Sequence, residues 1–170
     1  LRLKEITTGD EDGTWGTSTN TNLELIGEAL GYNTQDCFAT DANATTTVAD
    51  GATDPARALY FKVTSSATLT ATRTLTVAPS TVSRVMFIEN ATTGSQSIEI
   101  SQGSGANVTI PTGEVKIVYL DGAGAGAAVV DALSAVAFDL TSQVTGTLPV
   151  ANGGTGITSF GTGVGTALGN

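Results

Sequence analysis

The chain has 170 residues, sixteen acidic and seven basic side chains that give a net charge of −9, no histidine and a single cysteine. An electrostatic field of this sign repels nucleic-acid phosphates and anionic membrane surfaces, which argues against nucleic-acid binding. Because Cys37 stands alone and histidine is missing, the composition excludes a disulfide within the chain, a Cys/His zinc site and every histidine-based catalytic triad.

No apolar run approaches the roughly 18 residues that a membrane-spanning helix needs. The first residues, Leu1 to Glu5, lack the charged-then-apolar order of a secretion signal. We therefore expect no membrane insertion and synthesis in a reducing compartment. Because the sequence starts without methionine and stops in mid-pattern at GTALGN, we also expect it to be part of a longer chain. Threonine, alanine and glycine dominate the composition, which predicts a mainly β protein.

Residues 1–56 are strongly acidic, since ten acids follow Lys4 and no base occurs before Arg57. Such a run of one sign is typical of a solvated or partner-binding segment. The part from Asp36 to Asp54 is polar and turn-rich, which indicates a linker with at most one short strand. We interpret residues 1–56 as an acidic arm.

A short helix is predicted inside this arm, over about residues 22 to 30. Thr21-Asn22-Leu23-Glu24 is a capping-box pattern, and Gly31 is a natural stop. A helix of this length is marginal alone in water, so its apolar face needs a surface to dock on, in this chain or in a partner. That face repeats at helical spacing and consists of Leu23, Ile26 and Leu30.

Trp15 precedes the predicted helix in the stretch Gly13-Thr14-Trp15-Gly16. A single large aromatic side chain between glycines is suited to anchor the arm in a pocket of a partner, or to pack on its own helix. The sequence leaves both readings open. The candidate docking residues are therefore Trp15, Leu23, Ile26 and Leu30.

Residues 57–133 alternate apolar residues with threonine at the period of two that half-buried strands show. The alternation is clearest at Ala67 to Thr72 and at Leu75 to Val77. Short strands at such close spacing, separated by Gly, Pro and Ser clusters, predict a small antiparallel β-sandwich. The expected strands cover 59–64, 67–72, 75–77, 85–89, 97–101, 107–110, 115–120 and 127–131.

One hairpin can be assigned from its turn. Gln102-Gly103-Ser104-Gly105 predicts a tight connection between a strand with Ile98 and Ile100 and a strand with Val108 and Ile110. The Gly and Pro residues at positions 111–113 and 121–122 supply the next turns.

Few residues offer catalytic or metal chemistry. Asp10-Glu11-Asp12-Gly13 lacks the spacing and the late bidentate glutamate of a calcium loop, so a solvated acidic turn is the simpler interpretation. No cluster of acids and aromatic residues marks a glycosidase groove. Gly122 to Gly126 and Gly161 to Gly165 resemble phosphate loops only in glycine content. No base next to Cys37 would activate its thiol, which favours a buried or half-exposed cysteine. We predict no enzyme activity, no cofactor and no metal.

The last segment, residues 134–170, has a different character. From Leu140 onward it contains no charged side chain and eight glycines among scattered apolar residues. This composition is too apolar for a solvated linker and too poor in apolar residues for a core. Its apolar side chains are therefore expected to be buried by neighbouring copies of the same segment, which predicts an oligomer.

Residues 146–156, GTLPVANGGTG, resemble a segment that recurs in tail-fibre and related tail proteins of tailed bacteriophages. Residues 13–22 and the run from Ser97 to Asp121 are similar to structural tail proteins of marine phages. The resemblance implies a homotrimeric virion protein, made in the host cytoplasm. Its N-terminal arm would dock on a tail adaptor or another tail-ring protein, and a distal region would contact a receptor on the host surface.

The resemblance also implies a hinge at the start of an extended, Gly-rich, intertwined fibre segment. Proline lacks a donor and fixes φ, while paired glycines permit positive φ, so the chain can bend where three copies meet. The residues assigned to this hinge and trimer contact are Pro149, Val150, Gly153, Gly154 and Ile157.

Two alternatives remain open at this stage. A capsid-attached head fibre or decoration protein would share the threonine-rich β-domain and the trimer, but would attach to the shell. An enzymatic tailspike would need an acidic and aromatic groove, which a domain beyond Asn170 would have to supply.

Overall fold

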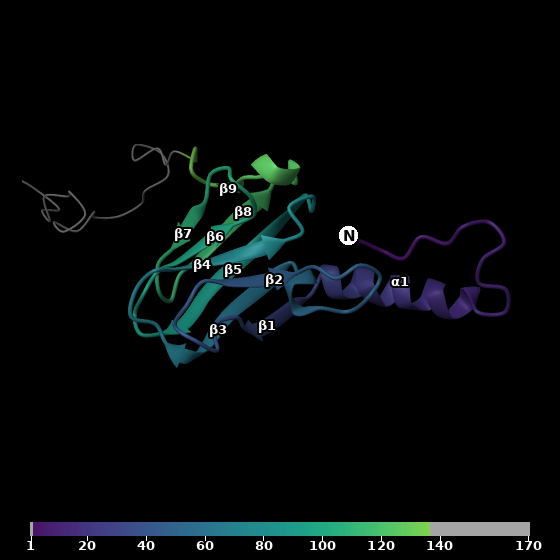
Figure 1. Cartoon of the computed structure of the whole chain (residues 1–170), viewed down its shortest axis with the longest axis horizontal. Helices are drawn as coiled ribbons and strands as arrows, with labels where there is room; N and C mark the ends of the chain where they lie inside the picture. The colour runs from purple at the N-terminus through teal and green to yellow at the C-terminus, as the bar shows by residue number, and fades with distance from the viewer. Residues whose placement is uncertain (1, 137–170) are drawn as a thin grey trace, which may run out of the picture. The chain divides into compact units, whose positions relative to one another are not determined.

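A computed structural model of the chain describes residues 2–136 (Figure 1). The chain divides into two compact units, Leu1–Ser134 and Ala135–Asn170, and the description below concerns the first. The prediction of a mainly β protein with one helix is confirmed for the described residues. The elements are α1 (Trp15–Ala29), β1 (Tyr32–Asp36), β2 (Ala44–Thr47), η1 (Pro55–Arg57), β3 (Tyr60–Thr68), β4 (Arg73–Ala78), β5 (Arg84–Thr93), β6 (Ile98–Ser101), β7 (Val108–Ile110), β8 (Val115–Leu120), η2 (Gly124–Gly126) and β9 (Val129–Asp131).

The strands form two mixed sheets. Sheet A has the order β1-β3-β5-β8-β9, and sheet B has the order β2-β4-β6-β7. From β1 to β6 the chain alternates between the two sheets. Each strand from β3 to β6 therefore pairs in parallel with the previous strand of its own sheet. The chain therefore winds around the core and adds one strand to each sheet per turn, and we call this path the coil of strands. It ends where β7 reverses direction beside β6, after which β8 and β9 return to sheet A (Figure 1).

The antiparallel arrangement expected from the sequence is wrong for β1 to β6. Four pairings are parallel, β1 with β3, β2 with β4, β3 with β5 and β4 with β6. Parallel neighbours need a crossover connection, and here the intervening strand of the other sheet serves as that crossover. A polar turn in the sequence is compatible with a hairpin and with a crossing to the other sheet, so the turn residues alone favoured the wrong topology.

Both sheets contribute to one hydrophobic core. Alternate residues of each strand point inward, as in β5, where Met86 and Ile88 are fully buried between partly exposed neighbours. The sequence showed this period of two in β4, at Leu75 to Val77. The remaining fully buried strand residues of the core are Phe61, Val63, Leu75, Val77, Ile98, Ile100, Ile110, Val118, Leu120 and Val129.

The alternating stretch from Ala67 to Thr72 is not a strand of its own. β3 ends at Thr68, and the next four residues carry the chain from sheet A to sheet B. Leu69 is buried in this crossing, and its N–H donates to the carbonyl of Thr93 at 2.9 Å. Asp41 holds the crossing in place, because it accepts a hydrogen bond from Thr70 and pairs with Arg73 at 2.7 Å.

β1 was missed and β2 was expected only as one possible short strand. β1 has the sequence YNTQD and no buried side chain, so it carries none of the apolar alternation by which a strand is recognised. It is nevertheless paired along its whole length with β3, from Tyr32 opposite Tyr60 to Asp36 opposite Thr64. Residues 32–47 of the acidic arm therefore provide one edge strand to each sheet.

The hairpin that the sequence assigned is confirmed. β6 and β7 are antiparallel, with Ile98 opposite Ile110 and Ile100 opposite Val108. All four side chains face the core. The expected β8 strand also agrees in both bounds with Val115–Leu120.

Candidate docking surface

The helix α1 is longer than the sequence predicted. It begins at Trp15, so Thr21 and Glu24 lie inside it and the predicted capping box is wrong. Gly, Thr, Ser and Asn in its first half are weak helix formers, which is why local sequence did not reveal this half. The end is as expected, since the helix stops at Ala29 and the N–H of Gly31 donates to the carbonyl of Glu28 at 3.0 Å.

One side of α1 is buried within the chain. Its buried residues are Ser18, Leu25 and Ala29, and the half-buried Asn22 lies on the same side. These positions recur at intervals of three and four residues, which places them on one face. Tertiary contacts along this face explain why a helix with weak intrinsic propensity is formed.

The four candidate docking residues lie on a second side of α1. At about 100° per residue they fall within an arc of about 80°, next to the buried side. Trp15 is 65% exposed, Leu23 61% and Leu30 72%, while Ile26 is half-buried. Trp15 is therefore not packed away on its own helix. We call these four residues the apolar stripe of α1.

Leu30 connects this stripe to a row of aromatic rings on sheet A. The row consists of Tyr32, Tyr60 and Phe87, which stand opposite one another on β1, β3 and β5. The ring centroids of Tyr32 and Tyr60 are 5.6 Å apart, and those of Tyr60 and Phe87 are 6.2 Å apart. Leu30 and these three rings line an open surface pocket of about 410 Å³.

Sequence reasoning missed this aromatic row. A signal was present, because Tyr32, Tyr60 and Phe87 recur at nearly constant spacing, and that spacing is one turn of the coil of strands. A repeat of three single residues is too weak to recognise without knowing which strands are neighbours.

A buried arginine attaches the end of α1 to the sheets. Arg57 in η1 is fully buried and donates to the carbonyls of Ala49 at 2.6 Å and Ala52 at 2.9 Å. Its guanidinium also forms ion pairs with Asp54 at 3.3 Å and with Glu28 of α1 at 3.9 Å. The charged hydrogen bonds to Ala49 and Ala52 hold Arg57 firmly in the loop that precedes β3. Glu28, in the last turn of the helix, is joined to this loop by its ion pair with Arg57 and by a hydrogen bond from Thr53 at 2.5 Å.

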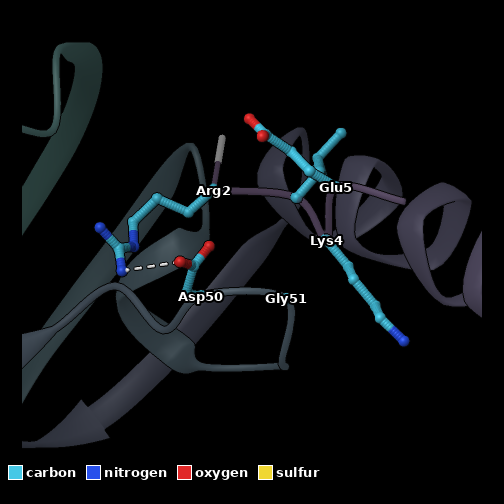
Figure 2. Close-up of a pocket in the computed structure, with 6 residues that line it drawn as sticks. Arg2, Lys4, Glu5, Asp50 and Gly51 are labelled. Carbon is cyan, nitrogen blue, oxygen red and sulfur yellow. Dashed lines mark ion pairs between the residues drawn. The ribbon is translucent and has the colours of Figure 1, made fainter. Parts of the chain in front are cut away.

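The N-terminal residues hold the helix from another side. Asn22 binds the backbone of Lys4 twice, accepting from its N–H and donating to its carbonyl, each at 2.9 Å. Arg2 pairs with Asp50 at 3.3 Å, and the N–H of Gly51 donates to the carbonyl of Arg2 at 2.9 Å. Figure 2 shows Arg2 and Asp50 pointing toward each other beside an open pocket of about 920 Å³. The arm therefore bridges α1 and the loop before η1.

The side chain of Lys4 points away from Arg2 and Asp50 (Figure 2). Its ammonium group binds Glu11 and the hydroxyl of Ser18, the latter at 3.1 Å. Hydrogen bonds from Lys4, Ser18 and Thr14 to Glu11 lower the pKa of that carboxyl to about 2. Glu11 is thus a structural carboxylate that ties the start of α1 to the arm.

The acidic turn and the cysteine show no sign of chemistry in the described part of the chain. No group of three or more His, Cys, Asp or Glu side chains in residues 2–136 is arranged to hold a metal ion. Cys37 is half-buried, as expected. Burial, with the nearby Asp36 carboxylate, raises the pKa of its thiol to about 12, which leaves almost no thiolate at neutral pH.

The hinge residues lie outside the described residues. These are Pro149, Val150, Gly153, Gly154 and Ile157. Among residues 2–136, no helix combines the length and the apolar character that crossing a bilayer requires. Comparisons with known protein families, with curated proteins and with solved structures find no match to this chain.

Proposed function

We propose that the chain is a non-enzymatic structural subunit of a bacteriophage tail fibre, and that its N-terminal region attaches the fibre to the tail. The observation that carries the attachment role is the apolar stripe of α1, in which Trp15, Leu23 and Leu30 are each more than half exposed. The resemblance of residues 146–156 to tail-fibre proteins supplies the class of assembly.

The stripe has the properties of a preformed binding element. It displays a tryptophan and aliphatic side chains at the spacing by which an amphipathic helix enters an apolar groove. Tryptophan is enriched among the residues that dominate binding energy. The contacts of Arg57 and Asn22 hold the helix before any partner arrives, so little conformational entropy remains to be lost on docking.

The rest of the proposal follows the resemblance. The two facing sheets form a β-sandwich-like body, and residues 134–170 begin an extended, Gly-rich shaft of a homotrimer in the virion tail. A tail adaptor or another tail-ring protein receives the apolar stripe. A distal region carries the contact with the host receptor.

The experiment is immunogold electron microscopy of virions that encode this chain, with antibodies raised against the purified protein. We expect gold particles where fibres join the tail. Labelling on the capsid would instead favour a head fibre or decoration protein, and unlabelled virions would refute a virion role.

The docking element is tested with the double variant Trp15→Ser and Leu23→Asp. We expect virions to lose most of the labelled fibres, because a charge in the apolar stripe is expensive to desolvate. Thr17→Asp is the matched control, since Thr17 is exposed and lies on another side of α1. Full incorporation of the double variant would refute the stripe as the attachment surface.

A further inference from the structure

The outward face of sheet A is unusually apolar. In an antiparallel or mixed sheet with one solvated side, the outward residues are normally polar. Here two neighbouring cross-strand rows of outward residues are apolar or aromatic. The rows are Tyr32, Tyr60, Phe87 and Ile117, then Val85, Tyr119 and Val130.

Several of these side chains are open to solvent in the described part of the chain. Tyr32 is 61% exposed, Val85 51% and Tyr119 40%. Five strands about 4.8 Å apart, four of them with at least five residues, make a face of about 400 Å² in all. This is about half of the 800 Å² or so that each partner buries in a stable protein interface. The apolar and aromatic rows occupy only part of that face, and exposed side chains of this kind gathered in neighbouring rows are typical of an interaction surface.

The charge of this face indicates which partner it suits. The only charged side chains among the outward residues at its centre are Lys62 and Glu89, which neutralise each other in an ion pair of 2.8 Å. Glu89 also accepts a hydrogen bond from the hydroxyl of Tyr60 at 2.9 Å. The whole chain carries −9, so two copies repel each other wherever unpaired acids meet. The centre of this face carries no net charge, although the exposed Asp36 lies at the end of its edge strand β1. Two copies can approach through this centre without that repulsion.

We propose that the outward face of sheet A packs against the same face of further copies of this chain, around a common symmetry axis. The inference rests on the proposed function in one respect, the expectation that a fibre subunit is a homotrimer. It adds the surface that the β-domain contributes to that trimer. Trp15 and Leu23 of the apolar stripe then remain available for the tail, while Leu30 adjoins this face at the pocket it lines with the aromatic row.

Cross-linking tests the contact directly, in the whole 170-residue chain with Cys37→Ser as background. Identical residues approach one another near a symmetry axis. We expect Val85→Cys to be joined between chains by a short bis-maleimide, giving a covalent dimer on a denaturing gel. Thr45→Cys is the control, because Thr45 is exposed on the outward side of sheet B. Equal, weak cross-linking of both variants would overturn the proposal.

Sedimentation over a range of concentrations gives a second measurement. The double variant Val85→Glu and Tyr119→Glu is expected to weaken association at least tenfold, because it places like charges against each other across the axis. Thr45→Glu should leave association unchanged, and circular dichroism should show that all variants are folded. If the glutamate variant fails to fold, the Val85→Cys result alone decides.

The possible outcomes separate the two proposals. An unmodified protein that remains a monomer at every concentration contradicts the homotrimer and this inference together. An oligomer that neither cross-links at Val85→Cys nor responds to the two glutamates contradicts only the inference. Cross-linking of Val85→Cys to a different virion protein, and not to itself, would assign this face to a foreign partner and also overturn it.

Discussion

Gly94 and Leu69 approach so closely that a Cβ atom on Gly94 would lie 2.1 Å from the carbonyl oxygen of Leu69. Gly94 also has a φ of +104°, a backbone conformation that residues with side chains rarely adopt. The two residues join the turn after β5 to the crossing after β3. One glycine therefore permits two successive turns of the coil to lie against each other.

Gly94→Ala should destabilise the protein by about 3 kcal/mol or more, because the backbone of Leu69 cannot move without disturbing the core. Urea unfolding followed by circular dichroism would measure the loss. Gly113→Ala is the control, since Gly113 also has positive φ, +75°, but open space around it. That variant should lose only about 1 kcal/mol. Equal losses in the two variants would show that the contact with Leu69 is unimportant.

Arg57→Met should cost about 3 to 5 kcal/mol, because Asp54 and the carbonyls of Ala49 and Ala52 then lose a buried charged donor. Hydrogen exchange should also become faster in α1, whose last turn Arg57 fixes through Glu28.

Lys116→Met is the matched control for Arg57→Met. Lys116 pairs with Asp131 at 3.0 Å in a partly exposed position. We expect a loss below about 1 kcal/mol and unchanged exchange in α1. Unchanged exchange in α1 of Arg57→Met would contradict the role given to this arginine.

Acid should weaken the attachment of the N-terminal arm. Glu11 has its folded-state pKa lowered from 4.5 to about 2, so its contribution to stability is complete above the unfolded value of 4.5 and is lost as the pH falls toward 2. Glu11→Gln should lower the midpoint of thermal unfolding at pH 7 and flatten its fall between pH 4.5 and 2. The exposed Glu24→Gln removes the same charge and should retain the steep fall. If the midpoint of thermal unfolding of the wild-type protein does not change between pH 4.5 and 2, the hydrogen bonds to Glu11 do not contribute to stability.

Cys37 should be nearly inert in the folded protein. With the pKa of its thiol raised from 9.0 to about 12, the thiolate fraction at pH 8 falls on the order of a thousandfold. Modification by a thiol reagent should therefore be slow in buffer and fast in denaturant. Rapid labelling of the folded protein would show that Cys37 is more accessible than its burial indicates.

The sequence alone was enough to predict the elements that depend on residues close together in the chain. The β6–β7 hairpin could be placed because its turn residues and its two apolar pairs, Ile98 with Ile110 and Ile100 with Val108, lie within thirteen neighbouring positions. The bounds of β8 followed from its short apolar run between two turns. The shared side of Leu23, Ile26 and Leu30 on α1 followed from helical spacing.

Tertiary packing decided the remaining features, because they depend on residues far apart in the chain. β3 pairs in parallel with β5 because this arrangement buries the inward side chains of both strands in one core. The polar turns between the strands do not specify this pairing. β1 is a strand only because β3 offers its edge, and the first half of α1 is helical because Asn22 and Ser18 find partners in the arm. The sequence contains Tyr32, Tyr60 and Phe87, but it does not show that these three residues lie next to one another. They form a row because β1, β3 and β5 are neighbouring strands in sheet A, and this pairing is a property of the tertiary structure.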